Sequence, residues 1–202
     1  MRALIRGIDA LLCRAYGIFD ISDDPDFLLR LQIGKAPHEL RFSNQVVAKG
    51  EPVLIIHLWN EHLLAVSPQG PDLAWAKKMY RAFETSLQQV ACWIEGDSNS
   101  HGIAAVGAIS YLIFAGPRAN GARMMERLGF TLMPYNNPLG GFGLFWENFY
   151  SWLLIWTYNP GDLQDHKLTE MHRDEMWIPV DEFLRRFGEN SFTPAVQPEK
   201  ER

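Results

Sequence analysis

Val53-Leu54-Ile55-Ile56-His57-Leu58 is an apolar run broken only by a histidine near its end. Strands that are covered on both faces have this pattern, whereas strands with one solvent face alternate apolar and polar residues. Gly50 and Pro52 mark the start of the run. The run therefore predicts the central strand of a sheet, around which the other elements are arranged.

An apolar stripe near the N-terminus predicts the first helix. Its members recur at three- and four-residue intervals: Leu4, Ile8, Leu11, Leu12 and Ala15. That spacing puts them on one face of a helix over residues 2–16. We expect this face to pack against the core, and we expect Arg6, Asp9 and Arg14 to point largely outward.

The rest of the chain mixes strands and helices. Two β-prone runs, at 27–33 and 40–48, predict a hairpin. Other strands are expected at 108–115, 130–133 and 170–178, and helices at 71–95, 118–128, 144–157 and 180–187. This mixture predicts one α+β domain over residues 1–188, with packed helices on a single mixed, mainly antiparallel sheet. Residues 189–202 are polar and rich in proline, so we expect a disordered tail.

Composition argues against several classes of protein. The chain has 202 residues and a formal net charge of -5, which suits one domain and does not suggest a nucleic-acid partner. Both cysteines fall in expected helices beside apolar residues and are read as buried free thiols. We expect a cytoplasmic protein with no transmembrane segment or cleaved leader. The aromatic run 142–158 leaves contact with a membrane surface open.

A polar cluster follows the central strand. The end of a buried strand commonly delivers polar groups into a cleft, and here those groups include Asn60, Glu61 and His62. A histidine beside a carboxylate can act as a general base, because imidazole titrates near neutral pH. His57 and Glu61 are therefore candidate catalytic residues, and Trp59, Asn60 and His62 are candidate ligand contacts. A structural, hydrogen-bonded role for these residues is the alternative.

The aromatic run offers a second candidate surface. Trp146 could stack on a sugar or an acyl chain, and Asn148 or Glu147 could supply a hydrogen bond. Core packing is the alternative for this segment. A metal site is not predicted, although His57 with His62, or the alternating residues Glu170, His172 and Asp174, carry suitable ligand groups.

Several segments together resemble the YkoP-like domain. They are the HLWNEHL stretch after the central strand, the PDLAWA helix start, the ERLGF turn and the FWENFYSWLLIWTYNPG stretch. The resemblance covers about residues 21–188. This largely uncharacterised bacterial domain is found alone or attached to polysaccharide deacetylase modules. The resemblance thus implies a role in cell-envelope polysaccharide metabolism and a saccharide or other small-molecule ligand, but it assigns no catalytic residue.

A second resemblance is to the GNAT acyltransferase fold. The expected order of elements is similar, and Leu128-Gly129-Phe130 looks like the turn that closes that family's last motif. This resemblance implies acyl-CoA as cofactor. However, Met125 stands where many members carry a general-acid tyrosine, and a thioether cannot give up a proton. Pro68, Pro71 and Asp72 also occupy the expected phosphate loop, where a carboxylate would repel phosphate.

Two functions therefore remain open from the sequence. The first is a non-catalytic binding or accessory module. The second is a GNAT-like acyltransferase that acts on an amino sugar or an envelope precursor, with His57 or Glu61 as base. The enzyme requires an open cleft beside residues 58–60, whereas the accessory module predicts a cleft filled by side chains such as Trp59 or Trp146.

Overall fold

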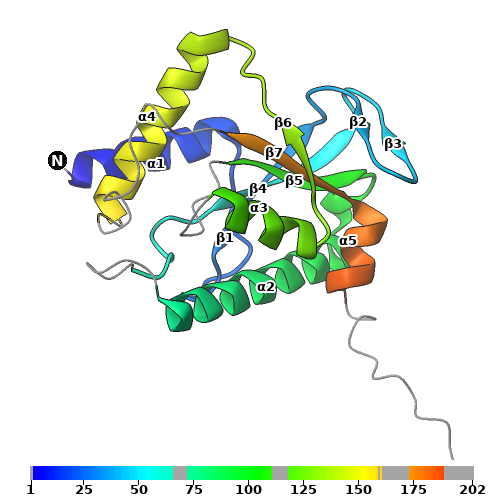
Figure 1. Ribbon diagram of the computed structural model, residues 1–202, viewed down its shortest axis with the longest axis horizontal. Coiled ribbons are helices and arrows are strands. Elements are labelled where there is room, and N and C mark those ends of the chain that lie inside the picture. Colours follow the sequence, from blue (N-terminus) through cyan, green and yellow to red (C-terminus); the bar gives the residue numbers. More distant parts are fainter. Residues whose placement is uncertain (1, 66–71, 111–117, 159, 161–172, 189–202) are drawn as a thin grey trace, which may run out of the picture.

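The computed structural model describes residues 2–65, 72–110, 118–158, 160 and 173–188. Within these ranges the chain forms an α+β fold, as the sequence predicts (Figure 1). The helices are α1 (Arg2–Tyr16), α2 (Leu73–Gly96), α3 (Arg118–Arg127), α4 (Gly140–Tyr158) and α5 (Val180–Phe187). The strands are β1 (Leu29–Lys35), β2 (Leu40–Arg41), β3 (Val46–Val47), β4 (Pro52–Leu58), β5 (Ala105–Ser110), β6 (Thr131–Pro134) and β7 (Asp174–Pro179).

The main sheet has five strands in the order β1-β4-β5-β7-β6. Only β4 and β5 are parallel, and the long helix α2 connects them, so the expectation of a mixed, mainly antiparallel sheet is confirmed. The β4–β5 ladder covers only three pairs, the last being Ile55 with Gly107. β2 and β3 pair with each other in a separate two-stranded sheet.

Both faces of β4 are buried, as its apolar run predicts. Leu54 and Ile56 face the larger core, which α2, α3 and α5 complete. Val53 faces a smaller core on the other side of the sheet, where it packs with Trp177. Alternate strand residues point to opposite faces, so one strand contributes to both cores.

The predicted hairpin between 27–33 and 40–48 is wrong. β1 pairs instead with β4 along seven positions, from Leu29 opposite Leu58 to Lys35 opposite Pro52. Leu29 and Leu31 are buried in the larger core. β1 therefore pairs with a strand whose side chains enter the same core, and β4 is such a strand. Turn residues between two β-prone runs cannot show whether the runs pair with each other or with a later strand.

The predicted orientation of α1 is also wrong in part. Leu4 and Leu11 are 67% and 66% exposed, whereas Asp9 is turned toward the sheet. Asp9 contacts Arg30 of β1 and Tyr150 of α4, and these polar contacts set the rotation of the helix. Figure 1 shows α1 and α4 side by side at one end of the molecule, away from β2 and β3.

The remaining differences concern boundaries and the thiols. α4 begins at Gly140 rather than 144, and β5 begins at Ala105 rather than 108. Cys13 is half-buried, but Cys92 is exposed on α2, contrary to expectation. The expected tail at 189–202 lies outside the described residues. None of the described helices is long and apolar enough to cross a bilayer.

Candidate functional site

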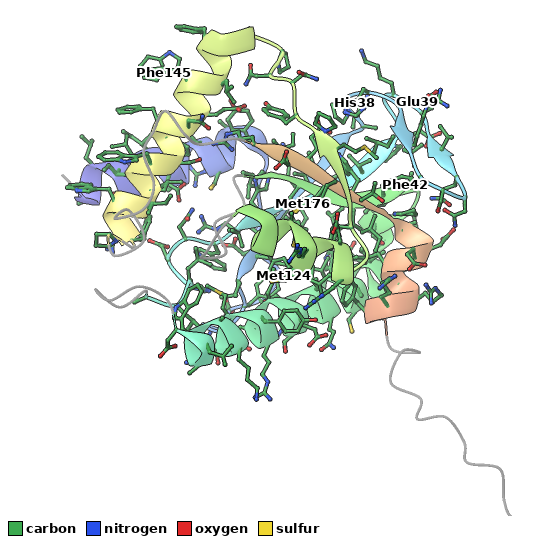
Figure 2. All side chains as sticks on the ribbon, viewed as in Figure 1. His38, Glu39, Phe42, Met124, Phe145 and Met176 are labelled. Carbon is green, nitrogen blue, oxygen red and sulfur yellow. The ribbon has the colours of Figure 1, made fainter. Side chains whose placement is uncertain are left out.

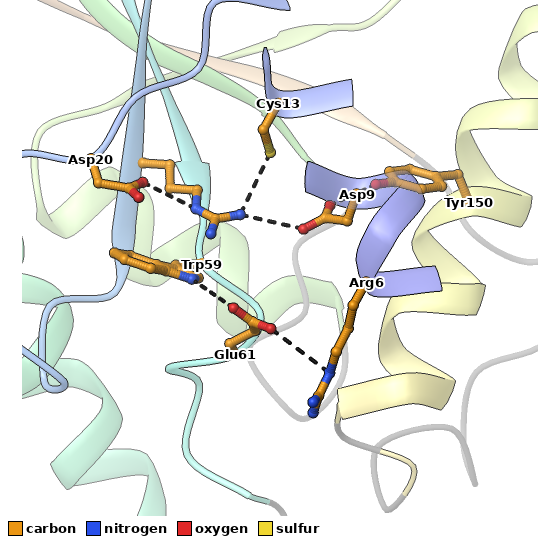
Figure 3. Close-up of polar contacts among 8 residues, drawn as sticks. Arg6, Asp9, Cys13, Asp20, Trp59, Glu61 and Tyr150 are labelled. Atoms are coloured by element: carbon orange, nitrogen blue, oxygen red, sulfur yellow. Dashed lines mark hydrogen bonds and ion pairs between the residues drawn. The ribbon is translucent and has the colours of Figure 1, made fainter. Parts of the chain in front are cut away.

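Arg30 is the centre of a polar cluster at the sheet. It projects from β1 on the face opposite Leu29 and Leu31, and its side chain is only 17% exposed. Its Nε donates to Asp20 Oδ1 at 3.1 Å, and its Nη1 donates to Asp9 Oδ2 at 3.3 Å (Figure 3). Two carboxylates thus compensate the desolvation of one guanidinium.

Trp59 supports the same guanidinium from another side. The Arg30 Cζ lies 4.4 Å from the Trp59 ring centroid, which is a cation–π contact. The indole also stacks on His62, with ring centroids 3.8 Å apart. Its Nε1 donates to Glu61 Oε2 at 3.4 Å. Trp59 therefore fixes both the position of Arg30 and that of the residues that follow β4.

A cavity of about 500 Å³ lies between α1 and the ends of β1 and β4. We call it the Arg30 cavity. Tyr158 of α4 and six charged residues line it. Its volume is in the usual range for small-molecule sites. The formal charges of the three arginines and three carboxylates cancel. The charged residues are Arg6, Asp9, Arg14, Asp20, Arg30 and Glu61.

Two tyrosines of α4 extend this cluster. Tyr150 Oη donates to Asp9 Oδ1 at 2.6 Å, and burial together with this bond raises the pKa of Tyr150. Burial, and then the charge of Glu61, raises the pKa of Tyr158 to about 12. Both phenols therefore remain protonated at neutral pH, so each has an O–H that can donate a hydrogen bond.

His57 lies on the same face of the sheet as Arg30, which is its direct cross-strand neighbour. Its Nε2 lies 2.9 Å from Gln32 Oε1, and Gln32 Nε2 donates to the carbonyl of Tyr16 at 3.0 Å. The amide oxygen can only accept, so Nε2 of His57 carries the proton. Burial, and then Arg30, lowers the pKa of His57 to about 4. The ring is therefore neutral and weakly basic at pH 7.

The phosphate-binding features of an acyl-CoA site do not fit the described residues. Asp72 caps α2, and its Oδ1 accepts from the backbone N–H of Trp75 at 2.7 Å. A carboxylate thus occupies the helix N-terminus, where a pyrophosphate would have to bind. Met125 is 1% exposed and belongs to the larger core. Pro68 and Pro71 lie outside the described residues.

One family model matches nearly the whole chain. It is described as the YkoP domain and matches residues 6–187. The chain belongs to the YkoP domain family. All the charged residues of the Arg30 cavity lie within this YkoP domain. No curated protein and no solved structure matches the chain.

The YkoP domain brings together three of the predicted site residues. Trp59 contacts both Glu61 and His62 beside the Arg30 cavity, and Glu61 lines the cavity. Asn60 lies with them in the turn after β4 and is half-buried. His57 bonds to Gln32, and no hydrogen bond or ion pair joins it to Glu61 within the described part of the chain. Their pairing as base and orienting group stays a prediction.

The two predicted residues of α4 lie apart from this cavity. Trp146 is 50% exposed and contacts Phe142, Phe145 and Phe149. Figure 2 shows Phe145 pointing away from the body of the YkoP domain. Asn148 is buried, and its Oδ1 accepts from Arg173 Nε at 2.9 Å. Neither is among the described residues that line the Arg30 cavity.

The residues that sequence reasoning missed carry most of the charge in the site. Arg30 stands between Leu29 and Leu31, which is the pattern of a residue on the exposed face of a strand. The single arginine between two leucines is the one local signal for this residue. Asp9 and Asp20 come from distant segments. Among the described residues of the YkoP domain, no group of three His, Cys, Asp or Glu side chains is placed to hold a metal ion. Glu170 and His172 lie outside them.

Proposed function

We propose that this chain is a non-catalytic binding module whose ligand is a small, polyhydroxylated molecule of the saccharide class. The observation that carries the proposal is the fixed position of the Arg30 guanidinium at the wall of the Arg30 cavity. Asp9, Asp20 and Trp59 hold it from three sides. A binding group that is already ordered loses little conformational entropy when a ligand binds.

The balance of charge supports a neutral, polar ligand. The charged side chains that line the cavity have both hydrogen-bond donors and acceptors, and their formal charges cancel. A sugar hydroxyl can donate one hydrogen bond and accept others, so a sugar matches such a mixed surface. A role in cell-envelope polysaccharide metabolism follows from the deacetylase association that the family resemblance implies.

The chemistry of the candidate bases supports a module without catalysis. A histidine with a pKa near 4 takes up a proton poorly at pH 7, and His57 already donates to Gln32. Glu61 instead lies beside Trp59 and Arg6. Met125, in the position of the acyltransferase acid, is apolar and buried.

Thermal unfolding with carbohydrates tests the proposal. Glucose, N-acetylglucosamine and N-acetylglucosamine oligomers are added to the full chain, and the shift of the midpoint is measured. A ligand at a hundredfold excess over its dissociation constant stabilises the folded state by about 2.7 kcal/mol. We expect a shift that Glu61→Ala abolishes and that Glu51→Ala, at an exposed control site, retains. If no carbohydrate shifts the midpoint or binds by calorimetry, the proposal is wrong.

Acyl transfer is the second candidate, and the order of elements favours it. The chain order of a first helix, the central strand β4, the long helix α2, the strand β5 and the short helix α3 is the order that the GNAT resemblance implies, although the hairpin expected before β4 is absent from the described residues. Acetyl-CoA and longer acyl-CoAs in the same assay distinguish the two functions. Stabilisation that is lost on His57→Ala would favour the enzyme, and no shift with any acyl-CoA would remove this candidate.

A further inference from the structure

The Arg30 cavity has one end at which polar groups are close but poorly paired. This end is formed by Arg6 of α1, Glu61 after β4 and Tyr158 at the end of α4, which we call the Tyr158 end. Arg6 Nε and Glu61 Oε1 are 3.8 Å apart (Figure 3), and the Arg6 Cζ lies 5.4 Å from the Tyr158 ring centroid. Three separate elements therefore direct polar groups toward one small region.

The hydroxyl of Tyr158 is the most informative atom of this end. It is buried and has no hydrogen-bond partner within the described part of the chain. A buried hydroxyl without a partner is uncommon and destabilises the folded state. Burial, and then the charge of Glu61 and a hydrogen-bonding contact with it, raise the pKa of Tyr158, but this contact lacks the geometry of a full hydrogen bond. A polar ligand group beside both side chains would offer the Tyr158 hydroxyl an acceptor and Glu61 a donor.

Glu61 is also loosely held. Its hydrogen bond from Trp59 is 3.4 Å long, and its ion pair with Arg6 is 3.8 Å long. By contrast, Asp9 accepts a 2.6 Å bond from Tyr150 and pairs with Arg30 as well. Among these carboxylates, Glu61 thus has the greater remaining capacity to accept a hydrogen bond from a ligand.

We infer that the Tyr158 end is a ligand subsite that takes a neutral group with one hydrogen-bond donor and an oxygen acceptor, namely an alcohol or a secondary amide. Tyr158 and Arg6 donate to the oxygen of this group, and its O–H or N–H donates to Glu61. The inference rests on the proposed function and names the ligand chemistry at one end of the same cavity.

Charged groups do not fit this subsite. An ammonium group would satisfy Glu61 but would repel Arg6 and could not accept from Tyr158. A carboxylate would accept from Tyr158 and Arg6 but would lie against Glu61. A hydroxyl and a secondary amide both have one donor and an oxygen with two lone pairs, which matches two donors and one acceptor.

Three sugars that differ only at carbon 2 test the inference by calorimetry. Glucose presents a hydroxyl there, N-acetylglucosamine a secondary amide and glucosamine an ammonium group. We expect at least one of the two neutral sugars to bind about tenfold more tightly than glucosamine near neutral pH, and the stronger of the two identifies the favoured group. Equal binding of all three sugars would overturn the inference and leave the proposed function standing. If no sugar binds, the proposed function fails, and the inference fails with it.

Tyr158→Phe separates a ligand contact from a structural role. Because the hydroxyl has no hydrogen bond of good geometry to any residue that the structure describes, its removal is expected to leave the unfolding temperature unchanged or to raise it. The same variant is expected to bind the favoured sugar about tenfold more weakly. Tyr16→Phe, at an exposed position, is the matched control and should change neither quantity. A lower unfolding temperature for Tyr158→Phe, or unchanged sugar affinity, would contradict the inference.

Discussion

The Arg30 guanidinium lies 4.4 Å from the ring centroid of Trp59 while it donates hydrogen bonds to two carboxylates. Arg30→Met removes the cation but keeps much of the side-chain volume. Asp9 and Asp20 then lose their cationic partner, so we expect the free energy of unfolding to fall by about 2 kcal/mol. Urea unfolding followed by tryptophan fluorescence measures the change. Arg41→Met, at a side chain that is 78% exposed, is the control and should stay within about 0.5 kcal/mol of the parent.

His57 should make the protein less stable in acid. Its pKa is about 4 in the folded state, against an ordinary value of 6.5, because the ring is buried and faces Arg30. The unfolded chain therefore binds the proton more readily, and stability is complete above pH 6.5 and falls as the pH drops toward 4. Between pH 7 and pH 4.5 we expect His57 to account for a loss of about 2 kcal/mol.

The variant His57→Gln tests this dependence. Glutamine can place its side-chain N–H near the position of the imidazole Nε2 and donate to Gln32, but it does not titrate. Stability measured by urea unfolding at several pH values should therefore fall less steeply in acid for the variant than for the parent. Parallel pH profiles for the two proteins would show that His57 is not the group responsible.

His38 should show the opposite shift. Its Nδ1 and Nε2 each lie 2.9 Å from an oxygen acceptor, the carbonyl of Glu39 and Oε2 of the buried Glu175 (Figure 2 labels His38 and Glu39). Only the protonated ring can donate to both, so the backbone bond and then Glu175 raise the pKa of His38. Its contribution to stability is complete below pH 6.5 and is lost as the pH rises through the raised pKa.

Glu175→Gln should lower the pKa of His38 toward its ordinary value, because the carboxylate charge is removed while an oxygen acceptor remains. Proton NMR titration of the His38 ring measures the pKa in the parent and in the variant. Glu51→Gln, on the exposed surface, serves as the reference variant. An identical His38 pKa in all three proteins would show that the ion pair does not form in solution.

Two glycines provide a matched test of packing. An added Cβ at Gly107 of β5 would lie 2.2 Å from the Trp177 ring and 2.4 Å from the Met176 carbonyl, whereas at Gly141 of α4 it would meet nothing within 4 Å. Gly107→Ala should cost about 2 kcal/mol through overpacking. Gly141→Ala should stabilise the helix by up to about 1 kcal/mol. Thermal unfolding of both variants measures the two effects. If the two midpoints shift in the same direction, the contrast in packing between the two glycines is wrong.

The accuracy of the sequence predictions depends on whether the deciding contacts are local. The run from Val53 to Leu58 predicts a strand buried on both faces, because a short segment that is apolar at nearly every position needs cover on both sides. The limits of α5 also follow from a local pattern. The partner of β1 does not follow from a local pattern. β1 pairs with β4 because Leu29 is buried in a core to which later segments of the chain contribute.

The candidate site is predictable only where its residues are close together in the sequence. Glu61 follows the central strand, so a strand end rich in polar groups indicates it. Arg30 and Asp9 are 21 residues apart and meet only because the fold brings α1 close to β1. Neither residue type nor spacing reveals this contact, and for the same reason the sequence predicts α1 with its polar side outward.

The ion pair between Asp9 and Arg30 has a consequence for how relatives of this chain diverge. A substitution at either position leaves a half-buried charge without its partner, so the two positions should change together among family members. Leu4 and Leu11 are on the exposed side of the same helix, so substitutions there should not require a matching change in β1. Co-variation between positions 9 and 30 would therefore identify the members that turn the same side of their first helix toward β1.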